Sequence, residues 1–136
     1  LMEAPLSPLC APGIARELRH PAELARTVLL RSYRSAEWPS WFAAACVEGP
    51  TLTGPVFDSS IALAEAAASG AGTALLPVAM FERFVAQGRL AQPFGTSVSA
   101  GRYYLAWPSE RPVTPAMATF TRWISGGQDR ETTAAG

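Results

Sequence analysis

One stretch of the sequence, Val56–Pro77 (VFDSSIALAEAAASGAGTALLP), restricts the fold more than any other. Its pattern is that of a strand, a polar turn, a short helix of small residues, a glycine exit and a second buried strand. Two such strands joined by a helix form a parallel arrangement with a right-handed crossover. The stretch therefore predicts an α/β fold.

The polar turn Asp58-Ser59-Ser60 stands where the predicted helix Ile61–Ser69 begins, with Gly70 placed to end that helix. A helix N-terminus presents backbone N–H groups and the positive end of the helix dipole, which suit a carboxylate or another anion. Asp and Ser also cap helices there, without any ligand. Because the turn follows a strand's carboxyl end, where α/β sheets bind ligands, both interpretations stay open.

Strands and helices alternate along the rest of the chain. Residue types indicate an apolar run at Leu6–Ala11 and strands at Thr27–Leu30, Leu90–Phe94 and Tyr103–Trp107. Helical spacing predicts helices at Gly13–Leu18, from Pro21, at Ser35–Cys46 with Ser35 as cap, at Met80–Gln87 and at Thr114–Ile124. This alternation predicts a mostly parallel sheet covered by helices.

Trp38, Trp41 and Phe42 form an aromatic cluster on one face of the predicted helix Ser35–Cys46. Such a cluster could stack on a ligand, but spacing of three and four more often marks the core side of an amphipathic helix, which we favour. The two cysteines, Cys10 and Cys46, match no metal-binding spacing and lie among apolar residues. We expect both to be small buried core residues.

Composition and motifs argue against catalysis and against nucleic-acid binding by this segment. The formal net charge is zero, and all eleven basic residues are arginine, which removes lysine chemistry. The one histidine, His20, lies in a loop, where we expect it to be solvated. The sequence has no nucleophile elbow, zinc-protease motif or phosphate-binding glycine loop, so we predict no enzymatic activity, no metal and no cofactor.

Polar groups at two further places suit a ligand. Tyr33-Arg34 follows the strand that begins at Thr27, and arginine offers a bidentate fork to a carboxylate or phosphate. A solvated surface arginine is the alternative interpretation. Tyr103 and Tyr104 point to opposite faces of one strand, so one of them should face away from the core.

Four segments together resemble the effector-binding domain of LysR-type transcriptional regulators. They are PLCAPGIA at 8–15, LLRSYRSAEWPSWFAAA at 29–45, VFDSSIALAEAAASGAGTALLP at 56–77 and TPAMATFTRWI at 114–124. Their order and spacing agree over roughly residues 3–125. Within the family, the second and third segments resemble the AmpR type most, the regulators of chromosomal β-lactamase genes. A regulator of the glycine-cleavage type, which senses another small molecule, shares much of the pattern.

The resemblance implies a periplasmic-binding-protein-like (type 2) fold, in which an effector cleft lies between two Rossmann-like subdomains. Residues 1–5 would cross over from a first subdomain, residues 6–100 would form subdomain II, and residues 101–125 would return to subdomain I. Residues 126–136 would be a disordered tail. The DNA-binding domain and the first part of the sensor domain would precede this segment, which leaves the last strand and helix partly uncovered.

The resemblance also implies the site residues. Ser60, with Ser59 and Asp58 of the same turn, and Tyr103 would line the effector cleft. The implied effectors are a repressing UDP-linked muramyl pentapeptide and an activating anhydro-muramyl peptide. Tyr104 stands where the family pattern prefers tryptophan, which is a departure from that pattern.

We therefore expect the sensor domain of a cytoplasmic regulator that self-associates as a dimer or tetramer. It would contact DNA only through its missing N-terminal domain. A solute-binding protein shares the two-lobed architecture and is the competing interpretation. A small α/β enzyme is a third, which the lack of a nucleophile and base disfavours.

Overall fold

The computed structural model describes residues 2–126, and the chain separates into two compact units. Ala4–Ala100 form the larger unit, and the smaller one holds the described residues of Leu1–Glu3 and Gly101–Gly136. The assignment of these segments to two subdomains of a regulator stays a prediction. A disordered tail was predicted over residues 126–136. Of these, residues 127–136 lie outside the described part of the chain.

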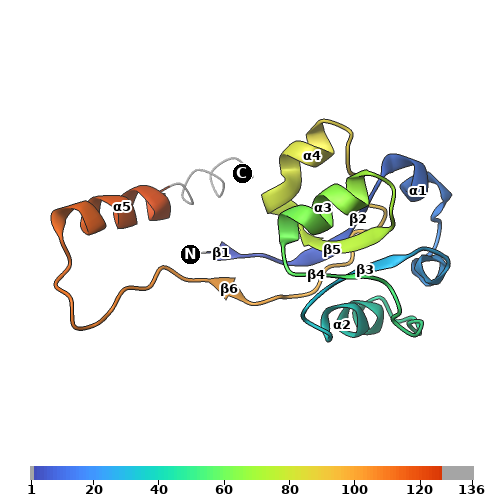
Figure 1. The fold of residues 1–136 in the computed structure, drawn as a ribbon, viewed down its shortest axis with the longest axis horizontal. Helices are drawn as coiled ribbons and strands as arrows, with labels where there is room; N and C mark the ends of the chain where they lie inside the picture. Colours follow the sequence, from blue (N-terminus) through green and yellow to red (C-terminus); the bar gives the residue numbers. More distant parts are fainter. Residues whose placement is uncertain (1, 127–136) are drawn as a thin grey trace. The chain divides into compact units, whose positions relative to one another are not determined.

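A four-stranded sheet forms the centre of the larger unit (Figure 1). Its strands stand in the order β2 (Leu6–Cys10), β5 (Thr73–Pro77), β3 (Leu29–Ser32) and β4 (Val56–Phe57). The last three are parallel to one another, whereas β2 runs antiparallel to β5. The predicted α/β class is confirmed, and the sheet is mixed because β2 enters it from the opposite end.

Helices cover both faces of this sheet (Figure 1). On one face lies α2 (Glu37–Ala44), and on the other lie α3 (Ser60–Ala68) and α4 (Glu82–Ala86). The shorter helical segments are α1 (Pro12–Glu17) and the 3₁₀ turns η1 (Pro21–Arg26) and η2 (Val78–Phe81). Each central strand is therefore buried on both faces, which its continuous apolar run indicates in the sequence.

Alternate residues of the two central strands, β3 and β5, enter two separate cores. Leu29 and Leu75 pack with the aromatic residues of α2, whereas Leu30 and Leu76 pack with the α3 side of the sheet. The direction of a strand side chain changes at every residue, so two adjacent leucines can serve both cores. The result is a three-layer arrangement of helix, sheet and helix.

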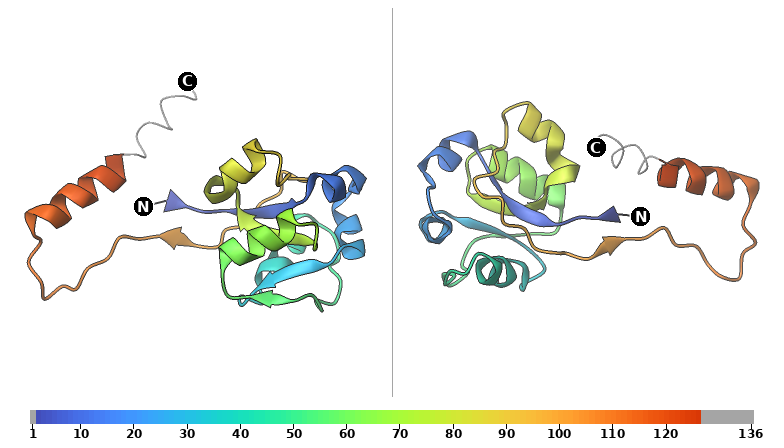
Figure 2. Two further views of the ribbon diagram at one scale, coloured as in Figure 1. Left: turned by 45° about the horizontal axis from the view of Figure 1, so that its top comes forward. Right: turned by 180° about the vertical axis from the view of Figure 1, so that it is seen from behind.

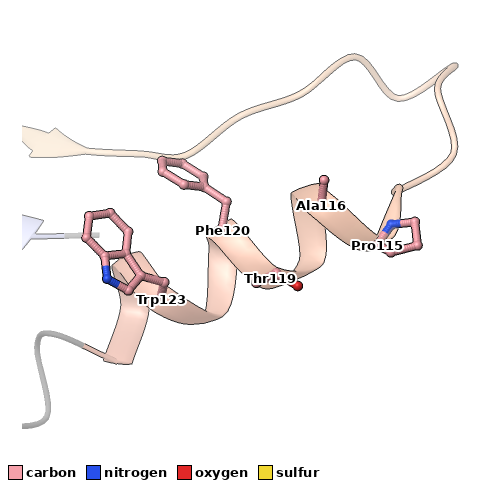
Figure 3. Close-up of a pocket in the computed structure, with 5 residues that line it drawn as sticks. All are labelled: Pro115, Ala116, Thr119, Phe120 and Trp123. Carbon is pink, nitrogen blue, oxygen red and sulfur yellow. The ribbon is translucent and has the colours of Figure 1, made fainter.

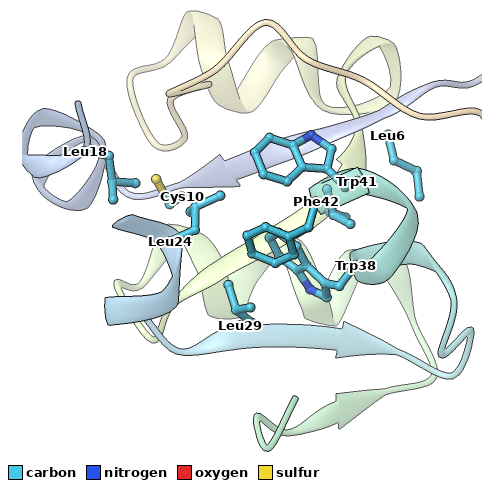
Figure 4. Packing of buried hydrophobic residues seen from close by; sticks show 9 residues of the cluster. Leu6, Cys10, Leu18, Leu24, Leu29, Trp38, Trp41 and Phe42 are labelled. Carbon is cyan, nitrogen blue, oxygen red and sulfur yellow. The ribbon is translucent and has the colours of Figure 1, made fainter. Parts of the chain in front are cut away.

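Trp38, Trp41 and Phe42 lie at the centre of the core on the α2 face (Figure 4). Their exposed fractions are 3%, 0% and 2%, and the Trp41 ring meets both neighbours edge-on. Each indole N–H also has an acceptor at 2.9 Å, the Leu30 carbonyl for Trp38 and the Thr96 carbonyl for Trp41. The core interpretation of this cluster is confirmed, and the stacking platform for a ligand is wrong.

Helices α2, α3 and α4 end in the same left-handed turn. Gly70 and Gly88 follow α3 and α4 with φ of +86° and +67°, as this turn requires, which confirms the predicted helix end at Gly70. After α2 the equivalent residue is Cys46, with φ of +56° and its N–H donated to the Ala43 carbonyl at 3.1 Å. A residue with a Cβ is strained in this conformation.

The two cysteines have different environments. Cys10 is buried in β2, as predicted, and burial raises the pKa of its thiol to about 11. Cys46 is exposed, so the prediction that it is a core residue is wrong. The physical reason is its position in the turn that ends α2, which takes it off the apolar face of the helix.

Replacement of Cys46 by glycine is expected to stabilise the larger unit by roughly 0.5–1 kcal/mol. The left-handed conformation costs a residue with a Cβ about 1–2 kcal/mol, and the greater freedom of glycine in the unfolded chain offsets part of that gain. The measurement is the midpoint of chemical denaturation. Ala45→Gly is the control: it lies one residue earlier in right-handed backbone (φ −79°) and should lower the midpoint. A lower midpoint for Cys46→Gly as well would contradict the strain argument.

The start of α2 differs from the prediction, because Ser35 does not cap it. The N-cap residue is Ala36, which makes no capping hydrogen bond. Instead, the Ser32 hydroxyl donates to the Glu37 carboxylate at 2.6 Å and also accepts the backbone N–H of Arg34 at 3.0 Å. A longer-range polar contact therefore orders the turn between β3 and α2.

Two predicted strands also have different bounds. β3 begins after Thr27, because the hydroxyl and N–H of Thr27 both donate to the Leu24 carbonyl and close η1. The segment Leu90–Phe94 is not a strand: Ala91 alone pairs with Cys10, and the proline in the segment lacks an N–H to continue the pairing.

The smaller unit contains a two-stranded antiparallel pair, β1 (Met2–Glu3) with β6 (Arg102–Tyr103). Arg102 and Glu3 face each other and form an ion pair. The strand predicted over Tyr103–Trp107 is shorter than expected. The register places Tyr103 opposite Met2, and residues 104–107 have no partner strand within the described part of the chain.

The last helix, α5 (Pro115–Gly126), exposes an apolar face (Figure 3). Trp123 is 72% exposed and Phe120 48% exposed, with their ring centres 5.8 Å apart. They line an open hollow of about 580 Å³ together with Pro115, Ala116 and Thr119. This exposure agrees with the expectation of a partly uncovered final helix, whereas self-association stays a prediction.

Candidate functional site

The carboxyl ends of the three parallel strands lie at one edge of the sheet (Figure 2). The chain segments that follow these ends are residues 33–34 after β3, 58–61 after β4 and 78–80 after β5. We call these residues the carboxyl edge. Ligands of α/β sheets bind beyond such an edge, so the carboxyl edge is the candidate site of the larger unit.

Within the turn Asp58-Ser59-Ser60, the structure assigns the capping of α3 to one of the two serines. Ser59 is the N-cap of α3: its backbone is extended, and its hydroxyl accepts the N–H of Ala62 at 3.4 Å. Ser60 is the first helical residue, and the described part of the chain supplies no hydrogen bond to its hydroxyl. All three residues are exposed. Capping therefore engages the hydroxyl of Ser59 and not that of Ser60.

Small side chains bring α3 close to the sheet. Ala64 and Ala67 are fully buried and pack in the same core cluster as Leu30 and Leu76. The helix starts directly after the turn that follows β4, so its N-terminal N–H groups and positive dipole end lie at the carboxyl edge. The alanine-rich pattern of the sequence thus positions the serine turn.

Tyr33 and Arg34 follow β3 at the same edge. The guanidinium carbon of Arg34 lies 5.3 Å from the ring centre of Tyr33, and a guanidinium nitrogen lies 3.6 Å from the Glu37 carboxylate. Partial burial alone would lower the pKa of Arg34, but the interactions with Tyr33 and Glu37 raise it above its ordinary value. Arg34 is therefore a stable cation with two neighbours that restrict its position.

Exposed apolar side chains accompany these polar groups. Tyr33 and Ile61 are each 68% exposed and Met80 is 52% exposed, and each follows the end of a different parallel strand. Ligand sites commonly combine apolar walls with a few polar groups. Neither Ile61 nor Met80 was predicted from the sequence, in which nothing marks them as exposed.

Tyr103 belongs to β6 of the smaller unit, where its side chain is 47% exposed. Its neighbour Tyr104 is 76% exposed. The structure therefore brings together Asp58, Ser59 and Ser60 at the carboxyl edge, whereas a shared site with Tyr103 stays a prediction.

His20 is exposed, which confirms the prediction of a solvated loop histidine, and it caps η1. Its Nδ1 accepts the N–H of Ala22 at 3.3 Å, and the Glu23 carboxylate accepts the N–H groups of Arg19 and His20. These backbone N–H groups lower the pKa of Glu23. Within residues 2–126, no group of three His, Cys, Asp or Glu side chains could hold a metal ion.

None of the helices in the described part of the chain has the length and apolar character needed to cross a membrane.

The chain matches a known protein family. The family is described as the LysR substrate binding domain, and it matches residues 1–128. Among curated relatives, the HTH-type transcriptional activator AmpR of Rhodobacter capsulatus is 69% identical over 126 residues. That match covers 93% of this chain and 44% of the relative, so the chain spans less than half of the relative's length.

Solved structures of effector domains are similar to this chain in both sequence and fold. The effector domain of the transcriptional regulator AmpR of Pseudomonas aeruginosa has a TM-score of 0.91 and 44% identity, over 98% of this chain and 65% of that chain. A Citrobacter freundii effector binding domain with three substitutions has a TM-score of 0.87 and 40% identity, over 91% and 64%. It carries valine for a threonine, alanine for a serine and phenylalanine for a tyrosine, the last two 43 positions apart.

Proposed function

The chain belongs to the LysR substrate-binding-domain family, and on this premise we propose that it is the larger part of the effector-sensing domain of a transcriptional regulator. The observation that carries the proposal is the 69% identity to an AmpR activator over nearly the whole chain. The regulator would act in the cytoplasm, self-associate and control a β-lactamase gene. The names of the HTH-type relatives support contact with DNA through a part of the regulator outside this segment.

Ser60 and Tyr103 are the residues that we propose to bind the effector. They are 43 positions apart, like the serine and tyrosine replaced in the Citrobacter freundii domain. No other serine and tyrosine of this sequence have that order and spacing. The absence of a capping role for Ser60 adds support, because its hydroxyl then remains available to a ligand.

The effector that we propose is a muramyl peptide from cell-wall recycling. Such a molecule carries carboxylates, amides and hydroxyl groups, together with apolar sugar and alanine surfaces. The carboxyl edge offers matching groups: the Ser60 hydroxyl, the Asp58 carboxylate and the exposed apolar side chains of Ile61 and Met80. Repressing and activating peptides would shift the regulator between two states by binding them with different affinities.

Loss of either hydroxyl is expected to weaken binding of an anhydro-muramyl peptide about three- to tenfold, the range of one neutral hydrogen bond. The measurement is calorimetric titration of the full-length regulator, wild type against Ser60→Ala and Tyr103→Phe. Tyr104→Phe is the matched control on the neighbouring residue, and its affinity should not change. Ser59→Ala should instead lower the stability by about 1 kcal/mol through loss of the cap. Unchanged affinity in both Ser60→Ala and Tyr103→Phe would contradict the site.

A further inference from the structure

A network of polar side chains stands at the β3 end of the carboxyl edge, and it includes neither Ser60 nor Tyr103, the residues proposed above to bind the effector. It consists of Ser32, Tyr33, Arg34 and Glu37. The Ser32 hydroxyl donates a hydrogen bond to the Glu37 carboxylate at 2.6 Å and accepts one from the backbone N–H of Arg34 at 3.0 Å. Arg34 thus joins this network through its backbone N–H, and its guanidinium contacts both the Tyr33 ring and the Glu37 carboxylate.

This network lies beside the serine turn. β3 and β4 are parallel, and their register pairs Arg31 with Val56 and Ser32 with Phe57. Continued by one residue, the same register brings Tyr33 level with Asp58. The segment that carries Arg34 therefore leaves the sheet next to the segment that carries Ser60, and one ligand at the carboxyl edge can reach both.

The guanidinium of Arg34 is accessible and only loosely paired. Its side chain is 53% exposed, whereas that of Glu37 is 13% exposed. The separation of 3.6 Å between the two charged groups is longer than the 2.7–2.9 Å typical of a direct charge-assisted hydrogen bond. A ligand carboxylate can therefore approach the exposed side of the guanidinium while Glu37 keeps its contact with Ser32.

The charges around Arg34 favour a single carboxylate over a phosphate group. Arg31, the nearest other cation in the sequence, donates its Nε to the Gly54 carbonyl at 2.7 Å and is thus directed toward the loop before β4. The Glu37 carboxylate lies 3.6 Å from this guanidinium, and the β3–β4 register puts Asp58 on the neighbouring segment, so two carboxylates belong to the same edge. A multiply charged diphosphate would be repelled there, whereas one carboxylate can pair with the guanidinium fork while Asp58 accepts N–H or O–H donors of the same ligand.

We propose that Arg34, held in position by Tyr33 and Glu37, binds a carboxylate of the effector beside Ser60 at the carboxyl edge. The inference rests on the proposed function and makes it more specific: the ligand group at β3 is a carboxylate of the peptide and not the diphosphate of a UDP-linked muramyl peptide. Tyr33 restricts the guanidinium through its ring and offers an exposed apolar surface to the adjoining part of the ligand.

The test compares two probes with the full-length regulator by calorimetric titration. One is an anhydro-muramyl peptide, which has carboxylates and no phosphate, and the other is the same peptide with its carboxylates converted to amides. Arg34→Gln should weaken binding of the carboxylate probe about tenfold or more and leave the affinity for the amide probe unchanged. Arg34→Lys keeps the charge without the fork and should give an intermediate loss. The control is Arg83→Gln, an exposed arginine of α4, which should bind both probes like the wild type.

The outcomes separate this inference from the function on which it rests. Equal affinity of wild type and Arg34→Gln for the carboxylate probe, with Ser60→Ala still weakened, overturns the role of Arg34 alone. An equal loss for both probes also overturns it, because the loss would then not depend on a carboxylate. Failure of the wild type to bind either probe overturns the proposed function and this inference together. The thermal unfolding temperature of Arg34→Gln is measured as well. If it equals that of the wild type, a loss of affinity does not come from a loss of fold.

Discussion

Replacement of Gly54 by alanine is expected to lower the free energy of unfolding by about 3 kcal/mol or more, because it displaces the loop before β4 from the neighbouring strand β3. A Cβ at this position would lie 1.9 Å from the carbonyl oxygen of Leu29, a backbone atom of β3. The loop cannot simply move away. Its next residue, Pro55, accepts the backbone N–H of Arg31 at 2.9 Å, and the Gly54 carbonyl accepts the Arg31 side chain. Relief of the clash therefore separates the loop from β3 and disturbs the pairing of β4.

The measurement is the midpoint of chemical denaturation, followed by tryptophan fluorescence. Gly72→Ala should behave like Gly54→Ala, because its Cβ would meet the Val28 carbonyl oxygen at 2.2 Å. Gly13→Ala and Gly95→Ala are matched controls, since a Cβ at either position has open space. Gly13 lies in α1, where alanine should even be stabilising by up to about 1 kcal/mol. A midpoint for Gly54→Ala that equals those of the controls would contradict the close approach of this loop to β3.

The elements that the sequence predicts well are those with local causes. Val56–Pro77 has a capped start, an alanine-rich helix, a glycine exit and an apolar strand, and each of these signals lies within a few residues of the structure that it produces. The core role of Trp41 follows in the same way, because the three-and-four spacing of the aromatic residues requires no knowledge of a distant partner.

Features that depend on distant partners could not be predicted. The direction of β2 is set by its pairing with β5, more than sixty residues later in the sequence. Cys46 has apolar neighbours, but the left-handed turn after α2 decides its exposure. The strand at Tyr103 is limited by the length of its partner β1, which the residues of β6 themselves do not indicate.

The same distinction applies to the candidate site. Asp58-Ser59-Ser60 could be located because a strand end and a helix start coincide there. Which serine caps the helix required coordinates, since the residue types are identical at positions 59 and 60. Ile61 and Met80 were missed because their exposure follows from the meeting of three strand ends, which a linear pattern does not contain.

Replacement of Trp41 by alanine is expected to lower the free energy of unfolding of this 136-residue chain by about 3–5 kcal/mol. The side chain is fully buried and contacts Trp38, Phe42 and Phe94, so its removal leaves a cavity that these rings cannot fill without changing their own packing. A loss of this size is a large fraction of the stability of an ordinary domain. The readout is the midpoint of chemical denaturation.

Two comparisons separate the contributions of ring packing and of the hydrogen bond. Trp41→Phe keeps an aromatic ring but loses the donation to the Thr96 carbonyl, which still accepts the Ser7 hydroxyl at 2.8 Å. Because that carbonyl does not become unsatisfied, Trp41→Phe should be destabilised by only about 1–2 kcal/mol.

Trp123→Ala is the matched control for the loss of an indole, and in this chain its 72% exposed side chain should contribute about 0.5 kcal/mol or less. Equal losses for Trp41→Ala and Trp123→Ala would mean that α2 does not anchor the core, and the packing of this face of the sheet would have to be reassigned.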